Sequence, residues 1–516
     1  MYKRKKSWQQ LLFPLFLCIG ILCFVTGCHR DTSVATDKLP LKVSSVDDLK
    51  GKKIGVQLGT TGDLYASDYE NDDYGTKVER YNKGNDAIQA LKNDKIDAVI
   101  IDEEPAKAFV NANSNLLILT EDFANEEYAI CIGKENTQLL DNINQALEQL
   151  KENGTLDKIK KNYTGSDSEK GCFPYIPMNI DRPNGTLTVA TNATFPPYEY
   201  HQNGKITGFD IDMMQAICDI LGMELQIVDM EFDSIINAVQ SGKADVGASG
   251  FTITEERKQN INFSIPYTNA KQVIIVKNPN ATEDSLSFSE KFKQNFLEDE
   301  RWKYLTEGLK STLIITFFSL IIGIILGFLV AIIRTWHEKN GGLSILNLLC
   351  KLYLTVVRGT PVVIQLLIIY YVIFSSVNID KVLVAVIAFG LNSAAYVAEI
   401  VRSGIMSIEQ GQFEAGRSLG LTFSQTMRHI ILPQAVKNIL PALGNEFIVL
   451  LKETSISGYI GLADLTKGGD IIRSVTYEPF LPLVAVALIY LVLVTILTSG
   501  VHALERRLAS NEKSHQ

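Results

Sequence analysis

The sequence lacks the motifs that would bind a nucleotide phosphate or coordinate a metal. No GxxxxGK[ST] segment occurs in its 516 residues, so hydrolysis of a nucleoside triphosphate would need another chain. Its seven cysteines show no CxxC or His–Cys spacing, so we expect neither a metal nor a cofactor. The net charge of −9 offers no basic face and argues against a nucleic-acid partner.

Charged residues are also scarce, and the hydrophobic residues are unevenly distributed. Only 21% of the residues are charged and 46% are hydrophobic, which is rich for a purely soluble protein. The apolar residues concentrate between Leu11 and Val25 and again from Ser311 onward. We therefore expect a globular region between an N-terminal apolar segment and a membrane region.

Residues 1–28 are expected to form an export signal of the lipoprotein type. A basic start, MYKRKK, precedes an apolar run that is short for a membrane span. Val25-Thr26-Gly27-Cys28 resembles a bacterial lipobox, which would make Cys28 the lipidated N-terminus after cleavage. An uncleaved signal anchor is the alternative, and either would export the region that follows.

Short β-branched runs alternate with helical patterns in the region that follows. KKIGVQL, TKVERY and IDAVII are typical of buried strands, and NDAIQALKND has helical periodicity. This order predicts a mostly parallel sheet covered by helices. It occurs twice, in an N-terminal lobe at 37–164 and a C-terminal lobe at 186–282, on either side of a polar linker at 165–185. Two successive α/β lobes suggest a ligand cleft between them.

A second linker, 283–306, leads to an expected membrane region at 307–508 and a short tail at 509–516. Lys and Arg cluster after the first apolar segment, around 402–437 and after the last apolar segment. By the positive-inside rule these loops and the C-terminus are cytoplasmic, and the two lobes lie outside the cell. The expected spans are Ser311 to Ile333, Pro361 to Val377, Val382 to Ile400, Leu440 to Leu451 and Phe480 to Ser499.

A polar island, EAGRSLGLTFSQTMRHIILP, separates two of these apolar segments. It resembles the EAA loop of ABC-importer permeases, a pair of short cytoplasmic helices that docks into a groove of the ATPase subunit. VVRGTPVVIQLL and FGLNSAAYVAEIVRSGI also resemble the histidine/glutamine permease subfamily, which implies a permease homodimer. The resemblance implies ATPase contact through Glu414, Ala415, Gly416, Gly420, Leu432 and Pro433.

The exported region carries a second resemblance. ATNATFPPYEY, GFDID and SGFTITEERK resemble the first lobe of polar amino-acid binding proteins of the type II periplasmic-binding fold. LKGKKIGVQLGTTGD and KIDAVIIDEEPAKAFV resemble the second lobe of that fold. The implied fold class is therefore multidomain, with a two-lobed α/β binding domain and an all-α transmembrane permease of about five spans.

The lobe order is reversed relative to that family, because the N-terminal lobe matches the family's second lobe. A return strand and a closing helix, EEYAICIG and LLDNINQALEQLKENGTLDKIKKNY, precede the C-terminal lobe, so every expected piece is present once. This predicts a circular permutation in which 165–185 joins the old termini. The alternative is a tandem receptor that lost its middle and pairs its lobes between protomers.

The resemblance implies a site for an amino-acid zwitterion. Arg257 would hold the ligand carboxylate through two parallel hydrogen bonds, and Asp102 would take the ammonium group. Taken singly, each could be an ordinary solvated charge in the runs TEERK and DEE. Asp210 is expected to cap the helix that begins DIDMMQAI. The remaining expected ligand-binding residues are Gln57, Thr60, Thr61, Asn192, Phe195, Phe232, Ser249, Gly250 and Thr252.

The expected function is that of the binding and permease subunit of an ATP-driven amino-acid importer, and not of an enzyme. Its expected partners are the amino acid, the membrane and a separate cytoplasmic ATPase. Glutamine or asparagine is favoured, because relatives selective for cationic ligands commonly carry Asp or Glu where this chain has Asn192. The alternatives are an importer of basic amino acids, a ligand-gated channel like glutamate receptors, and an exported dehydratase using Glu199 as its acid.

Overall fold

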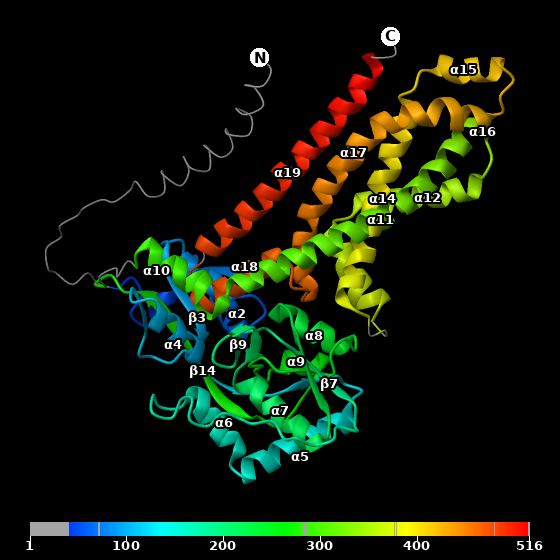
Figure 1. Cartoon of the computed structure of the whole chain (residues 1–516). Helices are drawn as coiled ribbons and strands as arrows, with labels where there is room; N and C mark the ends of the chain where they lie inside the picture. Colours follow the sequence, from blue (N-terminus) through cyan, green and yellow to red (C-terminus); the bar gives the residue numbers. More distant parts are fainter. Residues whose placement is uncertain are drawn as a thin grey trace.

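The computed structural model describes residues 41–70, 73–281, 286–375, 377, 379–478 and 480–513 (Figure 1). The expected signal and Cys28 lie outside these residues. Two α/β lobes lie at one end of the molecule, and long helices extend away from them. Cys131, Cys172, Cys218 and Cys350 are free thiols, so the described residues contain no disulfide.

The N-terminal lobe is built on a six-stranded sheet of order β2-β1-β3-β14-β4, with β5 paired to β14. The three leading strands are parallel, and β3 is buried along its whole length, as its sequence AVIID predicts. Helices α2, α3 and α4 pack against this sheet. The bounds are β1 Lys53–Gln57, α2 Thr61–Ser67, β2 Lys77–Tyr81, α3 Gly84–Lys92, β3 Ala98–Asp102, α4 Glu103–Ala112, β4 Leu116–Ile118, β5 Ala124–Tyr128 and β14 Thr268–Lys277.

The C-terminal lobe has a five-stranded sheet of order β11-β7-β12-β6-β13 and a small antiparallel sheet of order β10-β9-β8. Its core joins apolar side chains of the closing helices to those of α7, as in the contact group of Ile143, Leu147, Met213 and Ile217. The bounds are β6 Cys131–Ile132, α5 Thr137–Glu152, α6 Thr155–Thr164, β7 Thr186–Thr191, β8 Thr194–Phe195, β9 Glu199–Gln202, β10 Lys205–Thr207, α7 Phe209–Leu221, β11 Glu224–Asp229, α8 Phe232–Gln240, β12 Val246–Gly247, α9 Glu255–Asn260 and β13 Asn262–Phe263.

The chain crosses between the lobes twice, once from β5 to β6 and once from β13 to β14. Strand β14, expected within the C-terminal lobe, therefore lies in the sheet of the N-terminal lobe. Helices α5 and α6, the expected closing helix that follows the N-terminal lobe in the chain, pack on α7 of the other lobe. These differences arise because a strand's apolar pattern indicates burial but not the sheet it joins. After β14 the chain reaches the first long helix at Trp302.

Three helices among the described residues are long and apolar enough to cross a membrane: α11 (Trp302–Asn340), α14 (Lys381–Met406) and α19 (Phe480–Lys513). A pair bent by 110°, Ser344–Gly359 with Val362–Ile373, could make a fourth span. This is fewer than the five segments expected. Helix α17 (Leu432–Glu453) contains the expected fourth segment but also four charged residues, Lys437, Glu446, Lys452 and Glu453.

Helices α11 and α14 approach closely because glycines face the contact. A Cβ at Gly327 would lie 2.6 Å from Val397 Cγ1, and one at Gly323 would lie 2.9 Å from Ser393 Oγ. Small residues at such crossings are typical of helices that pack inside a membrane. A short amphipathic helix, α18 (Leu465–Thr476), connects this bundle to the lobes, as its contacts with β8 and β9 show.

Candidate functional site

A small cavity of about 10 Å³ lies between the two lobes. Its walls come from the ends of β1, β3 and β7 and the starts of α2, α8 and α9. The lining residues are Gln57, Thr60, Thr61, Asp102, Asn192, Phe195, Phe232, Ser249, Gly250 and Arg257. The structure therefore brings together every expected ligand-binding residue except Thr252, whose hydroxyl lies beside this cavity, 3.4 Å from that of Thr61.

Arg257 lies in the first turn of α9, where the Thr254 side chain accepts a hydrogen bond from its amide at 3.2 Å. The guanidinium donates to the Thr252 carbonyl at 2.9 Å and, across the cleft, to the Gly59 carbonyl at 2.8 Å. It also lies 5.7 Å from the ring centre of Phe232. These contacts hold a planar cation at the cavity, and its remaining N–H groups are those that could pair with a carboxylate.

Asp102 ends β3 and precedes α4, but its side chain makes no helix-capping hydrogen bond. It is buried and accepts a hydrogen bond from the Tyr128 hydroxyl. Burial, and then the nearby Glu126 carboxylate, raise the pKa of Asp102 to about 7. An ammonium group in the cavity would supply the missing opposite charge.

The strands β5 and β14, at which the chain crosses between the lobes, are called the hinge strands. Two of their buried polar residues were not predicted from the sequence. Glu126 on β5 accepts hydrogen bonds from Thr252 Oγ1 at 2.8 Å and from Gln272 Nε2 at 3.1 Å. Gln272 on β14 also lies 3.3 Å from Thr61 Oγ1. For Gln272 the available signal was a polar residue directly before the apolar run VIIV of β14, whereas β5, ANEEY, is mostly polar and offered no such signal for Glu126. These contacts connect both lobes behind the cavity.

Two side-chain amides close the other end of the cavity. Gln57 Nε2 donates to Asn192 Oδ1 at 3.4 Å, and Gln57 Oε1 accepts from the Gly84 amide at 3.2 Å. Asn192 donates in turn to the Met230 carbonyl at 2.8 Å. Phe232 stacks on Phe251 with ring centres 4.6 Å apart. This end therefore offers neutral hydrogen-bonding groups and an aromatic wall.

Two buried carboxyl groups lie behind Ser249 and Gly250. Glu199 accepts from Ser249 Oγ at 2.6 Å, and burial with the nearby Asp210 raises the pKa of Glu199 well above its ordinary value. Asp210 accepts from the Gly250 amide at 3.0 Å, and burial raises its pKa to about 6. The prediction that Asp210 caps α7 was wrong, because Gly208 takes the cap position and the Asp210 side chain holds Gly250 instead.

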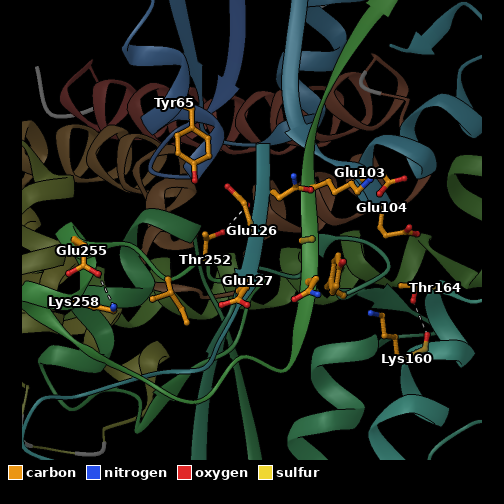
Figure 2. A pocket seen from close by; sticks show the side chains of 16 residues that line it. Tyr65, Glu103, Glu104, Glu126, Glu127, Lys160, Thr164, Thr252, Glu255 and Lys258 are labelled. Carbon is orange, nitrogen blue, oxygen red and sulfur yellow. Dashed lines mark hydrogen bonds and ion pairs between the residues drawn. The ribbon is translucent and has the colours of Figure 1, made fainter. Parts of the chain in front are cut away.

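A larger cavity of about 850 Å³ lies on the hinge strands (Figure 2). Glu126 and Thr252 contribute to it, together with Glu103, Glu104, Glu127 and Glu255. No arginine is among the described residues that line it. Five glutamates outnumber three lysines, Lys160, Lys258 and Lys271, in its lining, which disfavours a ligand carboxylate. The smaller cavity with Arg257 is therefore the better candidate for an amino acid.

The polar island folds into a helical elbow at the end of the bundle opposite the lobes (Figure 1). Helix α15 (Gln410–Ser418) stops before Gly420, which has φ +79°, and Thr422 with Gln425 forms a capping box for α16 (Phe423–Thr426). A Cβ at Gly416 would lie 2.5 Å from Thr426 Cγ2, so the elbow packs tightly. Glu414, Ala415 and Gly420 are exposed, Gly416 is buried, and Leu432 and Pro433 open α17.

Known proteins resemble different parts of the chain. The family described as bacterial extracellular solute-binding proteins, family 3, matches residues 71–166 and 187–451. The arginine transport system permease protein ArtQ of Bacillus subtilis (strain 168) is 42% identical over 211 residues, which are 40% of this chain and 94% of ArtQ. The glutamine transport system permease protein GlnP of Escherichia coli (strain K12) is 39% identical over 207 residues, 40% of this chain and 92% of GlnP.

A solved structure, that of an amino acid ABC transporter with histidines, is 41% identical. The match covers 43% of this chain and 99% of that one, with a TM-score of 0.39. The chain therefore resembles both solute-binding proteins and permeases. The permease part is nearly a whole permease, because the matches cover 94% of ArtQ and 92% of GlnP. The chain belongs to the bacterial extracellular solute-binding proteins, family 3, and carries in the same polypeptide a permease homologous to those of amino-acid ABC transporters.

Proposed function

We propose that this chain captures a polar amino acid outside the cell and passes it through its own membrane domain, driven by a separate ATPase. The observation that carries the proposal is the pairing of Arg257 and Asp102 in one cavity from opposite lobes. A carboxylate and an ammonium on one carbon need such an arrangement, and closing the lobes completes it.

Glutamine is the favoured ligand, with asparagine second. The side-chain end of the cavity presents the amides of Gln57 and Asn192, which can both donate to and accept from another amide. Glu199 offers no ready countercharge for a cationic side chain, because its raised pKa favours the neutral acid and Ser249 occupies one of its oxygens.

A basic amino acid is the second candidate. Glu199 lies one hydrogen bond behind Ser249, and a guanidinium that displaced this hydroxyl would favour the ionised carboxylate. The similarity to ArtQ, an arginine transport permease, supports the same candidate. A channel or a dehydratase has less support, since neither would need the elbow at 410–433.

The elbow is proposed to receive the ATPase on the cytoplasmic side, through Glu414, Ala415 and Gly420. Its position at the end of the bundle opposite the lobes supports this orientation (Figure 1). A permease homodimer is proposed because the subfamily that the membrane region resembles works as a dimer. The proposed division remains a binding domain at 37–282, a linker at 283–306 and a permease at 307–508.

The proposal is tested by a thermal-shift screen of the purified full chain against the twenty amino acids, because a ligand of the native state raises its apparent stability. Saturable stabilisation by glutamine, followed by glutamine uptake in vesicles with the ATPase, would support it. Tight binding of arginine or lysine with no response to glutamine would establish the second candidate instead. No response to any amino acid would contradict both candidates.

A further inference from the structure

A third cavity, of about 240 Å³, lies where the two lobes meet the membrane domain. The N-terminal lobe contributes the start of α3, the C-terminal lobe the residue before α8, and the membrane domain α18 and the 3₁₀ segment Thr454–Ile460. Its charged lining residues are Lys83, Asp86, Glu231, Lys467, Asp470 and Arg473. We call it the junction cavity.

Residues adjacent in the chain form the wall of the junction cavity and bond to the wall of the ligand cavity. Gln57 is bonded to the amide of Gly84, and Asn192 to the carbonyl of Met230. The neighbouring residues in the chain, Lys83 and Glu231, line the junction cavity. Gln57 and Asn192 come from different lobes and join through the amide hydrogen bond of 3.4 Å described above. Opening the lobes by a small angle would break it.

The junction cavity carries both signs of charge in balance. Lys83 lies 2.9 Å from Asp470 of α18 and 3.8 Å from Glu231 of the other lobe. Arg473 pairs with Asp86 at 3.0 Å and with Asp470 at 3.1 Å. These ion pairs connect the N-terminal lobe, the C-terminal lobe and α18. The cations and the carboxylates line the same cavity.

Three buried polar atoms in this cavity, one acceptor and two donors, have no hydrogen-bond partner among the described residues: Glu231 Oε2, Lys467 Nζ and Arg473 Nε. Glu231 Oε2 is buried and has no hydrogen-bond donor among the described residues, although Lys83 and Lys467 lie at 3.8 Å from the other oxygen of this carboxylate. Buried polar atoms without partners are unfavourable, so the site could accept both one more cationic donor and one more anionic acceptor. The α-ammonium of an amino acid is such a donor.

We propose that the junction cavity is a transit site for the zwitterionic amino acid on its way from the cleft to the membrane domain. The inference rests on the proposed function. Glu231 and Asp470 receive the ammonium, and Lys83 with Arg473 receives the carboxylate. The site recognises only the main-chain zwitterion, because both of its binding groups are charges and no aromatic wall is shared with the cleft.

The test uses the full chain with its ATPase in lipid vesicles and labelled glutamine and arginine. Glu231→Gln and Asp470→Asn each keep the side-chain shape and remove a charge. Asp122→Asn is the matched control, because Asp122 forms an exposed ion pair with Lys271 at 2.6 Å away from both cavities. Three quantities are measured: the dissociation constant, the ligand-stimulated rate of ATP hydrolysis, and the amino acid imported per ATP.

We expect both cavity variants to bind amino acid and to hydrolyse ATP within about threefold of the unaltered chain, and to import about tenfold less per ATP. The control should match the unaltered chain in all three. A parallel fall of ATP hydrolysis and import would show that these charges only dock the receptor, which overturns the inference. Import per ATP at the unaltered value would also overturn it.

A second variant covers the case in which a charge change prevents folding. Ser455 lines the junction cavity, so Ser455→Cys in a Cys172→Ser background can be labelled there by a bulky thiol reagent. Labelling should block import and leave binding unchanged, whereas import after complete labelling would contradict the transit site. If the unaltered chain neither binds nor imports an amino acid, the proposed function itself fails. That result differs from both blocked import and continued import after labelling, in which the unaltered chain is active.

Discussion

Arg257 is the residue on which ligand capture is expected to depend most. Replacing it by alanine removes the bidentate, charge-assisted contact with the ligand carboxylate, a loss of about 3 kcal/mol or roughly a hundredfold in affinity. Arg257→Lys should recover only part of this, because a lysine ammonium cannot form the same fork. Calorimetry on the full chain measures both variants. Near-normal affinity in a folded Arg257→Ala chain would show that the carboxylate binds elsewhere.

Asp102 predicts a pH dependence of binding. Its pKa is about 7 in the ligand-free site, and an ammonium ligand favours the ionised form and lowers it. Affinity should therefore fall below pH 7, by at most about tenfold per unit, and level off near pH 8, until the ligand's own ammonium group loses its proton at higher pH. Calorimetry in buffers of different ionisation enthalpy should detect proton release near pH 6.5. Asp102→Asn should bind weakly at every pH, and a flat profile in the unaltered chain would contradict this role.

At the scale of residues, the motifs were enough to predict which side chains line the cavity. They could not reveal Glu126 and Gln272, because these meet only after β5 and β14 pair across the hinge. Asp210 was misassigned for a local reason. An Asp in the first turn usually caps a helix, but here the burial of Tyr267 and Gly250 beside it gives its carboxylate other partners.

Among the elements, the elbow of α15 and α16 should transmit the ATPase stroke without affecting capture. Gly420→Asp places a side chain at φ +79°, at a cost of about 1 kcal/mol, and adds a charge to the exposed face. Glu414→Lys reverses a charge on that face. Both should lower ATP-driven uptake about tenfold or more and leave the dissociation constant unchanged.

Gly411→Ala is the matched control for the elbow, since a Cβ there meets nothing within 4 Å. Uptake in vesicles and binding by the same preparation are measured side by side. If both elbow variants import at the unaltered rate, the elbow is not the coupling element.

The elements themselves were largely predictable from apolar periodicity, but their partners were not. The run VIIVK indicated a buried strand, yet only the fold shows that it crosses the hinge as β14. Among the described residues, three helices, or four with the bent pair, have the length and composition of a span, and the fourth expected segment is the one that does not. An apolar stretch as short as Leu440 to Leu451 fits a buried helix as well as a membrane span. The helix that contains it, α17, also carries charged residues.

For the whole molecule, the predicted circular permutation leads to a prediction about stoichiometry. Both sheets and the ligand cavity are completed within one chain, through β6 and β14. Each chain should therefore bind one amino acid, whatever its oligomeric state.

Mixing tests this directly. Chains carrying Arg257→Ala and chains carrying Asp102→Ala are co-assembled, and binding is measured by calorimetry. If each chain closes its own cleft, the mixture stays inactive. If lobes pair between protomers, part of the binding returns, and the permutation is disproved.

The last strand of the binding domain ends at Lys277, and the first membrane helix begins at Trp302. Because so short a tether joins the receptor to its permease, the effective concentration of the receptor near the permease is on the order of millimolar. A diffusing receptor must bind tightly enough to be captured from dilute solution, and this tightness slows its release. The tethered receptor needs only a weak, quickly broken contact with α18. Import should therefore scale with the number of transporters in the membrane and be indifferent to the supply of any free receptor.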